Sequence, residues 1–93
     1  MKLAITETGI KNMVKDYLAI KGIYNYPILQ GLGAHRGVPD RIMHYQDRVH
    51  YLEIKVPGGK LSEYQEAFRL HCAEDNIPYH VITSLEDLQA IVG

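Results

Sequence analysis

The 93-residue sequence predicts an α/β fold in which a small mixed β-sheet is flanked by helices. Three patterns favour this fold class. An apolar stripe at helical spacing opens the chain, a run of alternating apolar residues fills its middle, and a capped helical segment separates two strand-like runs. With 46% hydrophobic and 23% charged residues, residues 1–93 fit one compact domain.

The first half of the chain predicts one helix and three strands. Thr6 is a typical N-cap, and the apolar stripe after it predicts a helix that ends at Gly22. Residues 23–29 predict a strand at the edge of a sheet, because the proline within them has no N–H to donate. Residues 40–45 and 49–56 predict a hairpin joined by a tight turn.

The second half predicts two helices and one strand. A proline-glycine-glycine segment ends the third strand, and Ser62 caps a helix over residues 63–75. Residues 79–83 predict a fourth strand, and Ser84 caps a last helix over residues 85–92. The element order is therefore α-β-β-β-α-β-α. Because a helix connects the last two strands, we expect these strands to be parallel.

Charge and cysteine content narrow the function classes. The net charge of −1 argues against a general nucleic-acid binder, although residues 30–60 are mildly basic and residues 61–93 are acidic. The single cysteine, Cys72, cannot form an internal disulfide and is expected to be buried. The N-terminus lacks an apolar signal core and no long apolar run follows, so we expect a soluble intracellular protein.

The middle of the chain contains two acidic residues and a lysine that are candidates for a catalytic site. Glu53 and Lys55 lie on one face of the third strand, because strand side chains alternate between faces. Asp40 follows Pro39 and begins the neighbouring strand. Two carboxylates can hold a divalent cation, and a lysine can orient a water or stabilise a developing anion. Metal-dependent cleavage of a phosphodiester requires such a set.

Each candidate also has a purely structural interpretation. Asp40 can be an ordinary turn residue after proline, and Glu53 with Lys55 can be an exposed ion pair. Gln65 occupies the third position of a capping box, so it either caps its helix or points its amide at the site. Glu7 lies in the first turn of the first helix, where a carboxylate complements the helix dipole without any catalytic role.

Taken together, these residues resemble the PD-(D/E)xK nuclease superfamily and, more narrowly, the virus-type replication-repair nuclease (VRR-NUC) family. The resemblance covers nearly the whole chain. It comprises Thr6-Glu7, residues 36–40, Glu53-Ile54-Lys55, residues 57–62 followed by Gln65, and residues 83–88. An acid-x-lysine motif alone is weak, whereas this ordered set at these intervals is specific.

The resemblance implies a PD-(D/E)xK restriction-endonuclease-like core that binds Mg²⁺ or Mn²⁺. Asp40 and Glu53 would be the metal ligands, and Ile54 would add its backbone carbonyl. Glu7 would be the acid of the first helix, acting directly or through a metal-bound water.

The resemblance also assigns the remaining site residues. Lys55 would be the catalytic lysine, and Gln65 would be the family's helix glutamine near the site. His35, Arg36 and Lys60 are expected to contact DNA phosphates, although the first two can also be ordinary loop charges.

The implied function is a divalent-metal-dependent DNA endonuclease that cuts branched DNA, most of all four-way (Holliday) junctions, as a homodimer. Two active sites related by a two-fold axis can cut two strands of such a junction. Small stand-alone members come from phages or prophages, which implies the cytoplasm of a bacterium or infected host. Two alternatives remain: a non-catalytic nucleic-acid- or protein-binding module with the same fold, and a flap or nonspecific nuclease.

Overall fold

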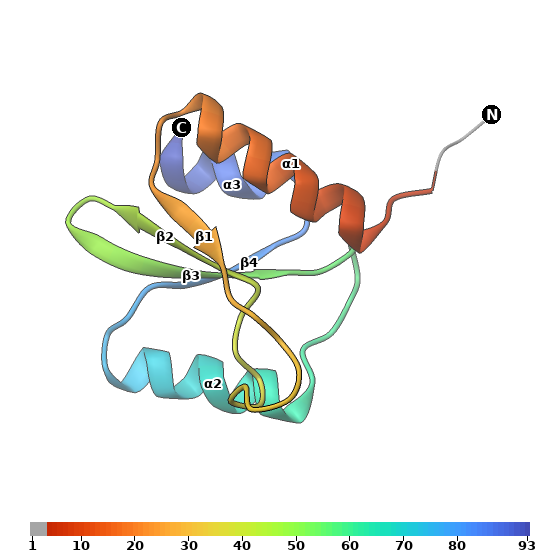
Figure 1. Cartoon of the computed structure of the whole chain (residues 1–93), viewed down its shortest axis with the longest axis vertical. Coiled ribbons are helices and arrows are strands. Elements are labelled where there is room, and N and C mark those ends of the chain that lie inside the picture. Colours follow the sequence, from red (N-terminus) through yellow and green to blue (C-terminus); the bar gives the residue numbers. More distant parts are fainter. Residues whose placement is uncertain (1–3) are drawn as a thin grey trace.

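The computed structural model describes residues 4–93. The elements are α1 (Glu7–Ile20), β1 (Asn25–Pro27), β2 (Arg41–Tyr45), β3 (Arg48–Ile54), α2 (Glu63–Glu74), β4 (Tyr79–Ile82) and α3 (Leu85–Val92). Figure 1 shows three layers, with α1 and α3 on one face of the sheet and α2 on the other. The predicted α/β class and the order α-β-β-β-α-β-α are confirmed.

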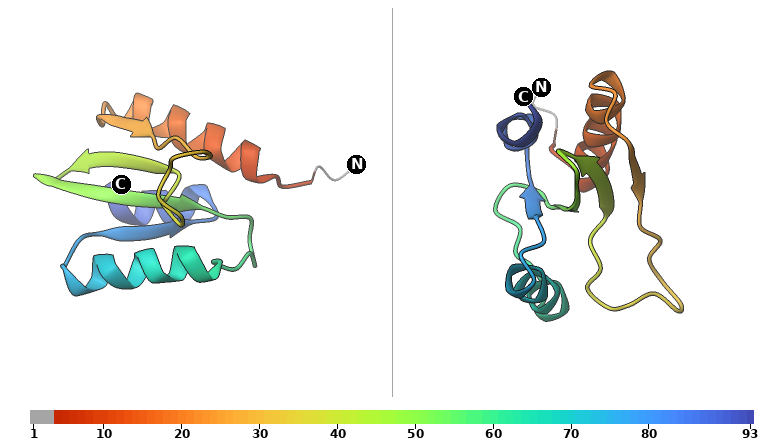
Figure 2. Two further views of the ribbon diagram at one scale, coloured as in Figure 1. Left: turned by 60° about the horizontal axis from the view of Figure 1, so that its bottom comes forward. Right: turned by 90° about the vertical axis from the view of Figure 1, so that its left-hand side faces the viewer.

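The sheet is mixed and has the order β1-β2-β3-β4. The pairs β1–β2 and β2–β3 are antiparallel, whereas β3 and β4 are parallel, as the helical crossover predicted. The hairpin turn consists of Gln46 and Asp47, with φ of 52° and 63°. Positive φ at both central residues suits the right-handed twist of the flanking strands. Figure 2 shows the twisted sheet between its helices from two further directions.

The strands are shorter than the sequence predicted. The first covers only Asn25–Pro27 instead of residues 23–29, and it lies at the sheet edge as expected. Backbone pairing nevertheless continues beyond β2, because the Ile28 N–H donates to the Asp40 carbonyl and the Asp40 N–H donates to the Leu52 carbonyl. The backbone of Asp40 is thus fixed between two strands although it precedes Arg41, the first residue of β2.

All three helices begin at the predicted caps. The side chains of Thr6, Ser62 and Ser84 accept hydrogen bonds from backbone N–H groups in the first turns of their helices. Each bond satisfies a donor that the helix itself leaves unpaired. Gly22, with φ of +71°, follows the end of α1. Within residues 4–93, no helix combines the length and apolar character needed to cross a membrane.

The main core lies between the sheet and the layer formed by α1 and α3. Val14, Leu18, Leu52 and Leu88 are fully buried there, and Ile54 is 1% exposed. Burying an aliphatic side chain of this size stabilises the fold by roughly 1.5–3 kcal/mol. The opposite side of β3 faces α2, where Cys72 is buried as predicted. The centre of β3 is therefore buried on both sides.

Candidate active site

Asp40 is fixed at the junction between the β1–β2 loop and β2. Its Oδ2 accepts a hydrogen bond from the Ile54 backbone N–H at 2.7 Å, and its Oδ1 lies 3.3 Å from the Lys11 Nζ. The Gln30 amide donates to the carbonyl of Pro39 at 3.2 Å and so holds the loop that leads into Asp40. The carboxylate is thereby anchored between α1 and β3, which an ordinary exposed turn residue would not be.

Glu53 is a buried carboxyl group in the middle of β3, only 2% exposed. Its Oε1 accepts a hydrogen bond from the Gln65 Nε2 at 2.8 Å and lies 3.9 Å from the Lys55 Nζ. Its Oε2 is one of two buried side-chain polar atoms in residues 4–93 without a hydrogen-bond partner. The interpretation of Glu53 and Lys55 as an exposed ion pair is therefore wrong.

The environment of Glu53 disfavours its ionised form. Burial raises the pKa of Glu53, the negative charge of Asp40 raises it further, and Lys55 offsets only part of the effect, leaving a pKa of about 8. In the free protein at pH 7 this carboxyl group is mostly protonated. Buried acids with a shifted pKa and a charged neighbour are concentrated at functional sites.

Gln65 combines the two roles that the sequence left as alternatives. Its Oε1 accepts from the Ser62 N–H at 2.8 Å, while the Ser62 Oγ accepts from the Gln65 N–H at 3.2 Å, which completes the capping box. The other end of the same amide donates to Glu53. One side chain thus starts α2 and fixes the orientation of the buried carboxyl group.

Glu7 lies at the border of the site, in the first turn of α1. Its Oε2 is 3.7 Å from the Lys11 Nζ, and its charge contributes to the raised pKa of Glu53. Burial lowers the pKa of Lys11, but the charges of Asp40 and Glu7 outweigh that effect and raise it above its usual value. Lys11 was missed in the sequence, although its position four residues after Glu7 places both on one helix face.

Two neighbouring carboxyl groups are the type of ligand that a small divalent cation takes. Mg²⁺ is commonly held by one or two carboxylates together with waters and substrate phosphates. A cation beside Asp40 and Glu53 would give the unpaired Oε2 a partner and favour the ionised form of Glu53. The described residues contain no group of three or more His, Cys, Asp or Glu side chains able to hold a metal. The Ile54 carbonyl, waters and phosphate oxygens would have to complete the coordination.

The three residues expected to contact DNA are exposed, and two of them line the same pocket. The Arg36 Nη1 donates to the Tyr64 hydroxyl at 2.6 Å, and the Arg36 guanidinium lies 5.0 Å from the centre of the Tyr64 ring. His35 and Arg36 line a pocket of about 370 Å³ that also includes Gln65. Lys60 lies outside that pocket, in the segment between β3 and α2.

Comparison with protein-family models, with curated proteins and with solved structures gave no match to this chain. The chemistry of the site therefore has to be inferred from its residues and their geometry. The structure brings Asp40, Glu53, Lys55 and Gln65 together, with Glu7 at the border, and adds Lys11 to the predicted set.

Proposed function

We propose that this protein is a divalent-metal-dependent DNA endonuclease with a PD-(D/E)xK core, related to the VRR-NUC family. The observation that carries the proposal is the buried Glu53 carboxyl group, which has one unpaired oxygen and lies beside Asp40 and Lys55. A buried acid without full pairing weakens the fold, and a function would account for its presence in this environment. A nuclease metal site is the function that best fits two carboxylates and a lysine.

In the proposed reaction Asp40 and Glu53 hold the cation, with the Ile54 carbonyl as a further ligand. When bound, Mg²⁺ or Mn²⁺ would polarise the scissile phosphate and lower the pKa of the attacking water. Gln65 holds Oε1 of Glu53 and leaves Oε2 free to coordinate. Lys11 neutralises part of the charge on Asp40. These contacts preorganise the two carboxylates before substrate arrives.

Lys55 supplies the positive charge of the reaction in this proposal. Its side chain is 17% exposed, so its ammonium group is partly shielded from water while remaining 3.9 Å from Glu53. A cation in such a position orients the attacking water or stabilises the negative charge that develops on the phosphate. Both roles need the charge to lie close to the carboxylates before the reaction, and the Lys55 Nζ is 3.9 Å from the Glu53 Oε1.

We further propose that the substrate is branched DNA, above all four-way junctions, and that the enzyme acts as a homodimer. The described chain is small and has a short, exposed edge strand, β1, next to the site. A dimer with a two-fold axis would present two active sites to the two strands that a junction-resolving enzyme must cut.

The test is cleavage of matched substrates: a four-way junction, a flap, a splayed arm, a linear duplex and a single strand, each in Mg²⁺ and in Mn²⁺. We expect metal-dependent, paired cuts in the junction. Lys55→Ala and Asp40→Asn should reduce the rate by about 10²-fold or more, the usual effect of removing an electrostatic catalytic group. Circular dichroism of both variants controls for the fold.

The other results would select the alternatives. Cutting of flaps or of every substrate would support the proposed nuclease activity and contradict the preference for four-way junctions. Wild-type-like cleavage by Lys55→Ala would contradict the site assignment. DNA binding without cleavage, together with no Mn²⁺ binding by calorimetry, would favour the non-catalytic binding module.

A further inference from the structure

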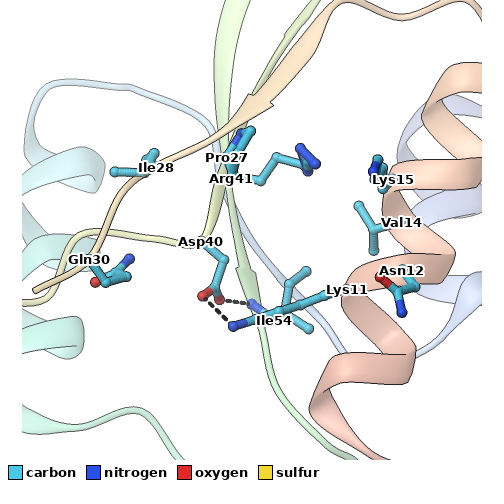
Figure 3. Close-up of a pocket in the computed structure, with 10 residues that line it drawn as sticks. All are labelled: Lys11, Asn12, Val14, Lys15, Pro27, Ile28, Gln30, Asp40, Arg41 and Ile54. Atoms are coloured by element: carbon cyan, nitrogen blue, oxygen red, sulfur yellow. Dashed lines mark hydrogen bonds and ion pairs between the residues drawn. The ribbon is translucent and has the colours of Figure 1, made fainter.

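A second set of charged residues lies on the α1 side of Asp40. A pocket of about 200 Å³ is lined there by Lys11 and Lys15 of α1, by Arg41 of β2, and by Asp40 and Ile54. Figure 3 shows the Arg41 side chain extending toward Lys15, while Lys11 reaches toward Asp40. The volume is several times the roughly 30 Å³ that one water occupies in the liquid, so a solvated anionic group fits.

The positive charge of this pocket is only partly neutralised. Lys11 is paired with Asp40 and Glu7. In contrast, Arg41 and Lys15 have no carboxylate within ion-pair distance among the residues that the structure describes. The Arg41 guanidinium is partly desolvated by burial, which lowers its pKa. A partly buried charge of this kind disfavours folding unless an anion joins it.

The placement of the two unpaired cations follows from the secondary structure. Glu7, Lys11 and Lys15 are spaced four residues apart and so share one face of α1, the face toward Asp40. Arg41 is paired in register with Leu52 and lines the pocket from the sheet side. An anion held between helix and sheet here would therefore lie next to the Asp40 carboxylate.

We infer that this pocket binds a backbone phosphate of the nucleic-acid strand, adjacent to the phosphate that is cut, through Arg41 and Lys15. This inference rests on the proposed nuclease function and adds a substrate-positioning subsite to it. The planar guanidinium of Arg41 can bond a phosphate with two parallel N–H groups, and Lys15 adds a point charge. Such contacts fix the register of a strand without reading its sequence.

The inferred subsite also suggests how a nucleic-acid strand would lie across the protein. The pocket that contains His35 and Arg36 lies on the α2 side and includes Gln65, whereas the pocket of Arg41 and Lys15 lies on the α1 side and includes Asp40. Gln30 lines both pockets. A strand that contacts both would run beside Asp40, which lines the first pocket, and beside Gln65, the partner of Glu53, which lines the second. Lys60 is not needed for this path.

The experiment measures the affinity of the whole chain for a fluorescent four-way junction and a fluorescent single strand, in EDTA, over a series of salt concentrations. The variants are Arg41→Gln and Lys15→Gln. The matched control is Lys21→Gln, which removes the same charge at the other end of α1, outside the pocket. Each pocket variant should weaken binding several-fold and reduce the salt slope for the junction by about one.

Two further measurements, one with a charge-conserving variant and one with a competitor, identify the ligand of the pocket. Arg41→Lys keeps the charge and should recover part of the affinity, which separates phosphate binding from a purely structural role. Inorganic phosphate serves as a competitor against labelled DNA. If free phosphate binds the wild type while Arg41→Gln leaves DNA affinity and salt slope unchanged, the pocket is a site for free phosphate and the inference is overturned.

Cleavage in Mn²⁺ separates this inference from the proposed function. If the wild type cuts DNA while Arg41→Gln and Lys15→Gln bind and cut as well as Lys21→Gln, the subsite is wrong and the nuclease stands. If the pocket variants lose affinity but the wild type never cuts, the pocket binds a backbone phosphate as inferred and the endonuclease fails. If the wild type neither binds DNA in EDTA at any salt concentration tested nor cuts it in Mn²⁺, both are overturned.

Discussion

Glu53 stores unfavourable electrostatic energy in the folded chain. Its Oε2 is buried without a partner, and its pKa is raised to about 8 by burial and by Asp40. One unit of pKa difference between folded and unfolded states corresponds to about 1.4 kcal/mol. In the proposed enzyme, this loss of stability would keep the site ready for a cation.

The first prediction concerns the stability of the metal-free protein at high pH. In the unfolded chain Glu53 loses its proton near its ordinary pKa of 4.5, whereas the folded chain keeps it up to about pH 8. The unfolded state then binds fewer protons, so the free energy of unfolding falls as pH rises through this window, by several kcal/mol in all. Glu53→Gln should remove that loss and be more stable than wild type at pH 8.5.

Urea unfolding in EDTA at pH 5.5 and 8.5 measures the effect. Burial lowers the pKa values of His50 and His80, so these residues favour folding as pH rises and affect both proteins alike. The contribution of Glu53 is therefore obtained from the difference in the pH dependence of the free energy of unfolding between wild type and Glu53→Gln. Glu63→Gln, at an exposed carboxylate, is the matched control. Equal pH dependence in wild type and Glu53→Gln would show that Glu53 carries no such strain.

At the scale of the elements, α2 begins with a capping box that also serves the site. The Gln65 amide bonds Ser62 at one end and Glu53 at the other. The start of this helix and the orientation of the carboxyl group therefore depend on the same side chain. Two substitutions can separate them, because the cap and the contact with Glu53 use different atoms.

The second prediction contrasts Gln65→Glu with Ser62→Ala. Glutamate is a usual third residue of a capping box, so Gln65→Glu should preserve α2. It replaces the amide donor with a carboxylate that repels the ionised form of Glu53, the form that binds a cation. Cleavage should therefore fall at least about tenfold, the low end for losing a charge-assisted hydrogen bond. Ser62→Ala should lower stability by about 1 kcal/mol and leave cleavage intact. Thermal unfolding and junction-cleavage rates are measured on both variants. Slow cleavage by Ser62→Ala together with wild-type-like cleavage by Gln65→Glu would contradict the prediction.

The β1–β2 loop is pressed against the first turn of α2 at Gly37. Gly37 and Gly58 both have φ of +82°, a conformation that costs other residues roughly 1–2 kcal/mol. A Cβ on Gly37 would collide with the backbone carbonyl of Tyr64, whereas a Cβ on Gly58 would meet nothing within 4 Å. Only Gly37 therefore reports on the packing between loop and helix.

The third prediction follows from this pair. Gly37→Ala should lower the free energy of unfolding by about 1–3 kcal/mol more than Gly58→Ala, the usual effect of forcing extra volume into a packed contact. It should also displace Asp40, which the same loop carries, and slow cleavage. Urea unfolding of the two variants side by side is the measurement. Equal losses would mean that the loop does not rest on α2 in solution.

Local signals predicted the elements better than their lengths. Thr6, Ser62 and Ser84 mark helix starts through bonds made within one turn, so the sequence alone identifies them. The extent of β1 depends on how many of its residues find partners on β2, which is a property of the assembled sheet. A propensity pattern does not show which residues will pair with a neighbouring strand. The strand predicted over residues 23–29 was therefore longer than the observed β1.

In the candidate site too, local motifs were predictable from the sequence, whereas contacts that depend on tertiary packing were not. Motif spacing predicted Asp40 and Glu53, but the contact of Lys11 with Asp40 depends on how α1 packs against the sheet. The repeat of charged residues at four-residue intervals from Glu7 through Lys15 was the available signal. The unpaired oxygen of Glu53 has no counterpart in the sequence, because it results from α2 covering that face of β3.

At the scale of the whole molecule, the exposed apolar side chains are unevenly distributed. The segment around β1 carries Tyr24, Leu29 and Leu32, which are 68%, 84% and 110% exposed, and β1 itself is an open sheet edge. An open edge with exposed apolar residues favours association with another chain. The proposed homodimer would bury this segment.

The last prediction tests the dimer through this surface. Tyr24→Ser with Leu29→Ser should weaken self-association, because each removes an exposed apolar side chain that only an interface would bury. Sedimentation over a range of protein concentrations measures the effect, and Leu70→Ser, at a 49% exposed leucine on α2, is the control. In the weakened dimer, paired cuts in a four-way junction should give way to single nicks, because each monomer carries one site. A wild type that sediments as a monomer at all concentrations, yet makes paired cuts, would show that pairing arises on the DNA rather than through this surface.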